Sequence, residues 1–364
     1  MKNKAVKFIC LLLSFFITAT GVLCAAAYIL DPQNVYRSNT NGVRYFSPIY
    51  STAPAIRTAD YDCVIIGSSM VQNFNASEIA SQLECKPLKL ALGALEPGEL
   101  LWLYNNTQEQ SNAKKYIINI DLHRFAASES VEPNCGRFPE YMYEPSGLSQ
   151  FKYLLGYETW FRFIPLQLAL TAVEALNIPL PESFKGSFEN ATDINSAGCW
   201  NELNPPGEDA LIDNFNSNTV VFNDGNTTVF SDNALANMDY FLGQLAGKLD
   251  SDEEIIIYLP PYSSLYWADK DSKQLEAIFA LREKIAVFAA KYDNIHLCDL
   301  QAESYVENLD LYMDKSHASV TIRKIAQQSV ITCTGEPTLH QIKDRNQTIK
   351  AYANNTLEKA KAKK

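Results

Sequence analysis

Five short runs of apolar residues constrain the fold of this chain more than any other feature. The runs are rich in β-branched residues and almost continuously apolar, which is typical of parallel strands covered on both faces. They are 63–67 (CVIIG), 88–92 (LKLAL), 116–120 (YIINI), 254–259 (EIIIYL) and 294–298 (NIHLC). Helical patterns separate them, so the sequence predicts an α/β fold with right-handed crossovers and an open, doubly wound sheet.

Four stretches between the apolar runs have helical patterns, and the last has strong spacing of three and four residues. They are 76–83 (ASEIASQL), 98–110 (GELLWLYNNTQEQ), 232–249 (DNALANMDYFLGQLAGKL) and 273–292 (KQLEAIFALREKIAVFAAKY). We expect Asn75 or Ser77 to cap the first of these helices, because a side-chain oxygen there can accept a free backbone N–H.

A long insertion, about 125–233, interrupts this alternation. It holds an apolar helix candidate at 160–176 and a predicted β-hairpin at 218–232 that turns at Asn223-Asp224-Gly225-Asn226. Insertions after the carboxyl ends of strands commonly build the rim of a binding site. We interpret the apolar helix first as a packed cover, and a lid or a partner-binding face are the alternatives.

The N-terminus predicts a membrane anchor. Residues 8–30 form an uncharged apolar run long enough to cross a bilayer, between the lysines of a short cytoplasmic tail (1–7) and Asp31. The alternative is a cleaved signal peptide, with Ala25-Ala26-Ala27 as the cleavage site. In both cases the rest of the chain is exported. The polar, basic tail at 336–364 ends in TLEKAKAKK (356–364), a helix-prone segment that is expected to be a solvated end, or less favourably a contact with an anionic surface.

The cysteines leave two hypotheses open. Six lie outside the apolar N-terminal run: Cys63, Cys85, Cys135, Cys199, Cys298 and Cys333. An even number in an exported domain allows three disulfides, for which fifteen pairings exist. The alternative is buried thiols that pack as small apolar groups. Their wide spacing does not resemble a zinc site.

Candidate chemistry lies where the predicted strands end, because ligands of open α/β sheets bind at the carboxyl ends of the strands. Gly67-Ser68-Ser69 follows the first strand, where a glycine permits a sharp turn. A serine needs a base within hydrogen-bonding reach and a third group that orients the base. His317 follows the fifth strand, and Asp314, three residues earlier, is placed to fix its tautomer.

The other three histidines have less specific interpretations. His123 follows the third strand and reaches either the site rim or the surface. His296 lies within the fifth strand and is expected to be a core residue, and His340 is expected to be solvated.

The formal net charge of −11 argues against a nucleic-acid partner, which would require a basic face.

These motifs resemble the SGNH/GDSL hydrolase superfamily. The similar residues are Gly67-Ser68-Ser69, Gly93 after the second strand, and Asp314-x-x-His317. More narrowly, the chain resembles a membrane-anchored, exported bacterial branch with G-S-S in place of G-D-S, related to the lipoteichoic acid D-alanylation protein and the SGNH-like polysaccharide acetylation proteins. Further similar segments are DPQNVY (31–36), LPPYSSLYW (259–267) and DKSHAS (314–319).

The resemblance spans about 31–335 and implies a three-layer α/β/α sandwich, the flavodoxin-like SGNH fold, after one transmembrane helix. It also implies that Ser69 is the nucleophile, that His317 is the general base and acid, and that Asp314 orients His317. The backbone N–H groups of Ser69 and Gly93 would bind the oxyanion, with Ser68 as a neighbour. This chemistry requires neither a cofactor nor a metal.

The segment after the third strand, INIDLHRF, departs from the family pattern, which supplies an asparagine side chain to the oxyanion hole. Asn119 is expected within the strand, and Asp121 is an anion that would repel an oxyanion. His123 or Arg124 could substitute, and Asp121 is expected to bind the Ser69 loop or a nearby backbone N–H. Tyr262 is a candidate for the site rim, together with Ser68, Asp121 and His123.

Two functional hypotheses follow. The first is a membrane-anchored serine esterase or O-acyltransferase that acts on acyl esters of a cell-envelope glycopolymer, with a polytopic membrane acyltransferase as a possible partner. The alternative is a catalytically weak or inactive accessory protein that binds an envelope polymer or such an acyltransferase. The residues Ser69, Asp314 and His317 favour the first hypothesis, and the departure after the third strand allows the second.

Overall fold

The computed structural model describes residues 2–37, 47–143, 147–179, 204–217, 232–335 and 337–363. The chain forms two compact units, Met1–Ala59 with Arg137–Ile194, and Asp60–Gly136 with Asn195–Lys364. Residues 31–59 and part of the insertion, both within the expected exported domain at 31–335, fall in the first unit together with the N-terminal helix. The predicted hairpin at 218–232 lies, but for its last residue, outside the described residues.

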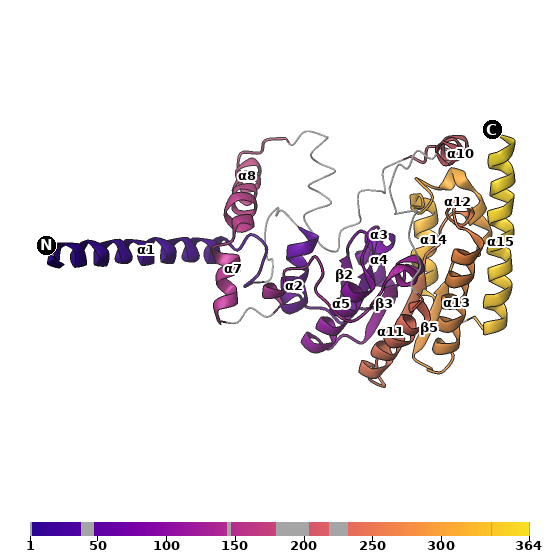
Figure 1. Ribbon diagram of the computed structural model, residues 1–364, viewed down its shortest axis with the longest axis horizontal. Coiled ribbons are helices and arrows are strands. Elements are labelled where there is room, and N and C mark those ends of the chain that lie inside the picture. The colour runs from indigo at the N-terminus through magenta and orange to yellow at the C-terminus, as the bar shows by residue number, and fades with distance from the viewer. Residues whose placement is uncertain are drawn as a thin grey trace. The chain divides into compact units, whose positions relative to one another are not determined.

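The second unit is built on one five-stranded, all-parallel sheet (Figure 1). Its strands are β1 (Cys63–Gly67), β2 (Pro87–Ala91), β3 (Lys115–Asn119), β4 (Glu254–Leu259) and β5 (Ile295–Asp299). They confirm the five predicted strands to within one residue at each end. The strand order is β2-β1-β3-β4-β5, so the connections from β1 and from β2 run in opposite directions across the sheet. Such a reversal opens a crevice at the carboxyl ends of the strands, where ligands bind.

Helices cover both faces of this sheet, which explains why its strands are apolar on both sides. On one face, α4 (Ala76–Leu83) and α14 (Val320–Ile331) pack over Ile65, Ile117 and Ile256. On the other face, Tyr104 of α5 (Pro97–Gln110) lies edge-to-face against Tyr116 of β3, with ring centroids 5.3 Å apart. The remaining helices of the unit are α3 (Ser69–Gln72), α6 (Leu122–Ala127), α10 (Glu208–Asn216), α11 (Ala234–Lys248), α12 (Ser264–Ala268), α13 (Ser272–Ala289) and α15 (Leu339–Ala362).

The predicted helix caps form locally. Asn75 is the N-cap of α4, and its Oδ1 accepts hydrogen bonds from the backbone N–H groups of Ser77, at 3.0 Å, and Glu78, at 3.2 Å. Of the two caps expected from sequence, Asn75 is therefore correct. All four helices that were predicted between the apolar runs are observed, as α4, α5, α11 and α13.

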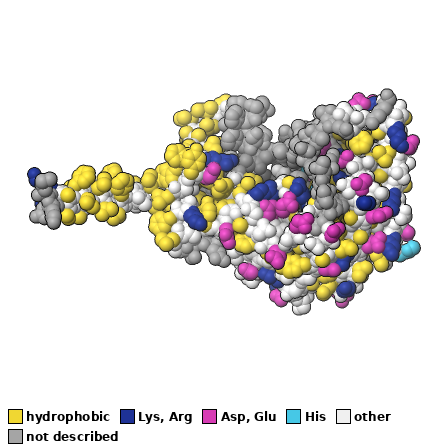
Figure 2. Space-filling model, in the orientation of Figure 1, with side chains coloured by type: hydrophobic (Ala, Val, Ile, Leu, Met, Phe, Trp, Pro, Cys, Tyr) yellow, Lys and Arg dark blue, Asp and Glu magenta, His cyan; other side chains and the backbone are white. Residues whose placement is uncertain are grey.

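The first unit contains α1 (Lys2–Leu30), α2 (Pro48–Thr58), α7 (Gln150–Leu154), a π-helical turn (Thr159–Phe163) and α8 (Ile164–Ala175). Residues 4–30 of α1 have a mean hydropathy of 2.4, and of these residues only Ala27 is buried, so α1 is long and apolar enough to cross a membrane. Figure 2 shows that most of its visible side chains are apolar. Just after α1, the backbone N–H of Gln33 donates to Oη of Tyr153 in α7 at 3.3 Å.

The apolar helix of the insertion is not the packed cover that we expected. In α8 only Ile164 and Leu170 are buried, whereas Leu168 is 52% exposed and Leu176, just after the helix, is 68% exposed. We predicted burial from apolar composition alone. This prediction was wrong because, among the described residues, no element covers most of the apolar side chains of α8.

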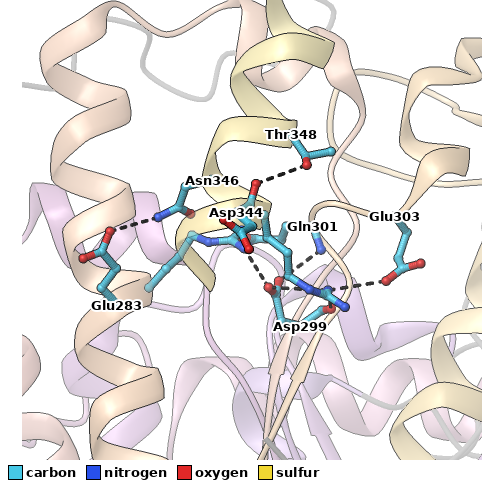
Figure 3. Close-up of polar contacts among 9 residues, drawn as sticks. Glu283, Asp299, Gln301, Glu303, Asp344, Asn346 and Thr348 are labelled. Carbon is cyan, nitrogen blue, oxygen red and sulfur yellow. Dashed lines mark hydrogen bonds and ion pairs between the residues drawn. The ribbon is translucent and has the colours of Figure 1, made fainter. Parts of the chain in front are cut away.

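The helix-prone segment at 356–364 is the end of a packed helix rather than a solvated end. It belongs to α15, in which Thr356 and Ala360 are buried together with Ile349, and α15 packs against α12 and α13. Polar contacts also fix α15: Asn346 Nδ2 donates to Glu283 Oε1 of α13 at 3.3 Å (Figure 3), and Arg345 Nη1 donates to the backbone O of Asp299 at 2.6 Å. The solvated end was predicted wrongly because the buried positions of α15 are few and lie among many polar residues.

A buried ion pair lies at the carboxyl end of β5. Arg282 Nη2 of α13 is 2.6 Å from Asp299 Oδ2, and both side chains are fully buried. Removing one partner of such a pair is more costly than losing the contact, because the other charge remains buried without compensation.

Asp299→Ala is therefore expected to lower the free energy of unfolding by about 3–5 kcal/mol. Urea unfolding of the detergent-solubilised chain measures this change. The matched control is Asp344→Ala, at a side chain 68% exposed, and it is expected to stay within about 0.5 kcal/mol of wild type. Equal losses in the two variants would contradict the assigned role of the buried pair.

Candidate active site

The turn after β1 presents Ser69 at the edge of the sheet. Ser68 is the N-cap of α3, and its Oγ accepts from the backbone N–H of Met70 at 3.3 Å. A Cβ atom added to Gly67 would lie 2.5 Å from Asn119 Cβ, which is closer than carbon atoms approach. The strand must therefore end in a glycine for β1 and β3 to lie side by side at this point.

Asn119, at the end of β3, holds this turn in place. Its Oδ1 accepts from both the backbone N–H and the Oγ of Ser68, each at 3.0 Å. Its Nδ2 donates to Asp121 Oδ1 at 3.2 Å, and Tyr262 Oη donates to the same oxygen at 2.6 Å. Asn119 lies within the strand, as expected, but the sequence did not indicate that its side chain binds the serine turn. The strand order β1-β3, once known, is the signal that places it there.

Asp314 and His317 lie on one short loop. An antiparallel bridge between Tyr312 and Ala318 closes the loop, and Met313 N–H donates to the backbone O of His317 at 2.7 Å. Asp314 Oδ1 accepts from the backbone N–H groups of Ser316 and His317, both at 2.7 Å. Its second oxygen, Oδ2, lies 2.7 Å from His317 Nδ1.

The serine turn and the histidine loop meet. Ser69 Oγ lies 2.8 Å from His317 Nε2, although the two residues are 248 positions apart. Because the Asp314 carboxylate occupies the Nδ1 side, the favoured tautomer of His317 carries its proton on Nδ1. The Nε2 lone pair then faces the serine hydroxyl, which is the arrangement that general-base activation requires.

The Asp314 carboxylate is held in its ionised form. Burial alone would raise the pKa of Asp314, but hydrogen bonds from the His317 ring, from its backbone N–H and from that of Ser316 outweigh burial and lower the pKa below its ordinary value of 3.8. A negative charge therefore stays beside Nδ1, where it stabilises the imidazolium that forms when His317 takes up a proton.

Gly93 lies next to the serine turn along the sheet edge. Gly67 and Ala91 are register partners, and Leu92 N–H donates to the backbone O of Gly67 at 3.0 Å. Ser69 and Gly93 thus each follow the last paired residue of neighbouring strands by two positions. Gly93 is exposed, and an added Cβ would meet nothing within 4 Å, so the space above it is open to a bound group.

Several expected rim residues are buried instead. Ser68 is 3% exposed, Tyr262 is 2% exposed and Asp121 is 8% exposed, and their polar atoms bind one another or Asn119. Asp121 supports the serine turn through Asn119 rather than by direct contact, which refines its expected structural role. The sequence did not predict their burial, because a polar side chain is buried only where its hydrogen-bonding partners lie beside it, and those partners come from distant parts of the chain.

The substitute oxyanion donors considered after β3 have other contacts. Arg124 Nη1 donates to Glu96 Oε1 at 2.6 Å. The His123 ring is partly buried and lies edge-to-face against Tyr266, with centroids 5.8 Å apart. Arg323, which the sequence did not single out, is nearly buried and lines a small hollow together with Ser69 and His317.

The two remaining histidines lie away from this site. His296 is half-buried in β5, with Nε2 3.5 Å from Glu254 Oε1, and the His340 side chain is 87% exposed, as expected. In the part of the chain that the structure describes, no group of three or more His, Cys, Asp or Glu side chains could hold a metal ion.

The fold and the contacts together define an α/β protein with a serine, a histidine and an aspartate at the carboxyl edge of a parallel sheet. Hydrogen bonds link the three side chains in that order. Comparison of the chain with protein-family models gives no match, and comparison with curated proteins gives none either.

The lowered pKa of Asp314 makes its contribution to stability depend on pH. A depressed pKa stabilises the folded chain above the unfolded value of 3.8, and this stabilisation is lost as the pH falls through the folded value. Asp314→Asn lacks the titrating group, so we expect the stability gap between wild type and this variant to narrow below about pH 4.

Urea unfolding at several pH values between neutrality and pH 3 measures the gap. Asp293→Asn, at an exposed loop position, is the control and is expected to follow the wild-type profile. A gap for Asp314→Asn that stays constant over this range would mean that the Asp314 pKa is not depressed.

Proposed function

We propose that this chain is an exported, membrane-anchored serine esterase or O-acyltransferase that acts on acyl esters of a cell-envelope glycopolymer. The observation that carries the proposal is the pair of contacts at His317, 2.8 Å to Ser69 Oγ and 2.7 Å to Asp314 Oδ2. The strand order and the helices on both faces support the resemblance to the three-layer SGNH fold. The glycopolymer substrate comes from that resemblance alone.

In the proposed reaction, Ser69 Oγ attacks the ester carbonyl while His317 Nε2 takes up its proton. Asp314 keeps the other ring nitrogen protonated and stabilises the charged ring. The tetrahedral intermediate then collapses, His317 returns the proton to the leaving alcohol, and the acyl group remains on Ser69. Water completes a hydrolysis, and a hydroxyl of an acceptor polymer completes a transfer.

Backbone N–H groups are the proposed oxyanion donors. Ser69 and Gly93 follow neighbouring parallel strands at equivalent positions, and the open space above Gly93 allows a carbonyl oxygen to approach. A backbone donor suits a site whose nearby Asn119 and Arg124 side chains bind Ser68 and Glu96. Those same two contacts favour the alternative, an accessory protein of weak or no activity, because they leave the oxyanion hole without these side-chain donors.

The proposed location rests on α1. Its apolar span would cross the cell membrane once, and the lysines before it favour a cytoplasmic N-terminus. The sheet unit would then lie on the extracytoplasmic side, beside envelope polymers. A polytopic acyltransferase in the same membrane is a plausible source of the acyl group in the transfer reaction.

Ser69→Ala is expected to reduce the release of p-nitrophenol from short-chain acyl esters by at least about 10³-fold, because the nucleophile is lost. Ser77→Ala, an exposed serine eight positions further on, is the matched control and is expected to keep wild-type activity. The double variant Ser69→Ala/His317→Ala is expected to be no slower than Ser69→Ala, since the two residues act as one unit.

Labelling with a fluorophosphonate tests the nucleophile without knowledge of the natural substrate. The expected result is a covalent adduct on the peptide that carries Ser69, absent from His317→Ala. Labelling that does not require His317 would reject the triad. A chain that neither labels nor releases p-nitrophenol, and whose Ser69→Ala variant leaves the envelope unchanged, would support the accessory alternative.

A further inference from the structure

Two pairs of cysteines lie side by side in the sheet unit. Cys63 is fully buried at the start of β1, and Cys85 is partly exposed just before β2. The β1–β2 register brings them together: Cys63 pairs with Pro87, and Cys63 N–H donates to the backbone O of Lys86 at 3.3 Å. The neighbouring Cys85 thiol and burial raise the pKa of Cys63.

The second pair has the same arrangement at the other edge of the sheet. Cys298 is buried in β5, and Cys333 is partly exposed just after α14. Cys333 packs against the core cluster that contains Cys298, and its thiol, together with burial, raises the pKa of Cys298. Each pair therefore combines a buried strand cysteine with an accessible cysteine at the end of a helical connection.

The two thiols of the first pair also differ in acidity. The hydrogen bond from Cys63 stabilises the thiolate of Cys85 and lowers the pKa of Cys85, whereas the same bond, together with burial, raises the pKa of Cys63. The accessible sulfur is thus the more acidic one, which suits it to react first with an external disulfide.

We propose that Cys63–Cys85 and Cys298–Cys333 are disulfides of the exported chain. The proposal rests on export to an oxidising compartment, as argued above for α1, and not on catalysis. It selects two specific pairs from the fifteen pairings that six cysteines allow.

The oxidant is a donor disulfide, carried by an exported thiol–disulfide oxidoreductase or by a small molecule. The Cys85 thiolate attacks one donor sulfur and the other donor thiolate leaves. The Cys63 thiolate then attacks the Cys85 sulfur of the mixed disulfide, and the second donor thiolate leaves. Two cysteine S–H bonds are lost and one S–S bond forms, while the donor takes up two electrons and two protons. Cys333 and Cys298 react in the same order.

The two bonds would enclose the proposed triad residues in covalent loops. The 63–85 loop contains Ser69, and the 298–333 loop contains Asp314 and His317. A cross-link restricts the unfolded chain, and the restriction is larger for the longer loop. Oxidation after export would therefore stabilise both segments that form the candidate site.

Disulfide mapping tests the proposal on the full chain recovered from membranes. The chain is quenched in acid, blocked with N-ethylmaleimide and digested without reduction. The expected result is one cross-linked peptide for each pair, each lighter by about 2 Da than the sum of its reduced peptides. Alkylation of Cys63, Cys85, Cys298 and Cys333, or a link from any of them to Cys135 or Cys199, would overturn the proposal.

Thermal unfolding gives a second, independent measurement. Cys63→Ser/Cys85→Ser and Cys298→Ser/Cys333→Ser are each expected to lower Tm by about 5–10 °C without reductant. In excess dithiothreitol, which reduces both bonds, the wild-type Tm should fall by about the sum of the two losses. A wild-type Tm that does not respond to reductant would contradict the proposal.

The same mapping on Ser69→Ala separates this proposal from the proposed function. Cross-linked peptides in both chains, without esterase activity in wild type, would support the disulfides and reject catalysis. Activity without cross-linked peptides would do the reverse.

Discussion

The candidate site depends on one short segment, Pro261-Tyr262-Ser263, which follows β4 and joins the two halves of the triad. Tyr262 Oη donates to Asp121, whose carboxylate accepts from Asn119, and Asn119 in turn binds the Ser68 turn. On the other side, Tyr312 Oη donates to the backbone O of Pro261. Ser263 Oγ donates to the backbone O of Lys315, inside the histidine loop.

This bridge explains how residues so distant in sequence keep hydrogen-bonding distance. Each half of the site is built locally: the serine turn from a glycine, a cap and a buried amide, and the histidine loop from three hydrogen bonds to Asp314. The buried amide of Asn119 reaches the serine turn from 51 positions away, and the contact between Ser69 and His317 spans 248 positions. The geometry of this second contact must be fixed to a fraction of an ångström for proton transfer. A buried chain of polar side chains, in which each of these donors has its acceptor, supplies that rigidity better than apolar packing, because its hydrogen bonds are directional.

The sequence predicted the strands well and the support of the site poorly, for a physical reason. Strands such as 63–67 and 254–259 are recognisable because burial on both faces requires a continuous apolar run. The pairing of Asp314 with His317 was also predictable, since the two are close in sequence. The role of Asn119 was not, because it depends on which strand lies next to β1, and strand order is a property of the whole sheet.

Two helices were predicted wrongly, one apolar and one polar, because hydropathy alone does not determine which side chains are buried. Most of the apolar side chains of α8 are exposed, and α15 is polar overall yet packs through a few apolar positions and the Arg345 contact to β5. The α15 contact matters for the site, since the backbone O that Arg345 binds belongs to Asp299, and Asp299 also neutralises the buried Arg282. Because β5 leads directly into the segment that carries Asp314 and His317, the C-terminal helix holds the strand from which the histidine loop departs. The C-terminal helix, whose last residues were expected to be a solvated end, is therefore part of the framework that positions the proposed base.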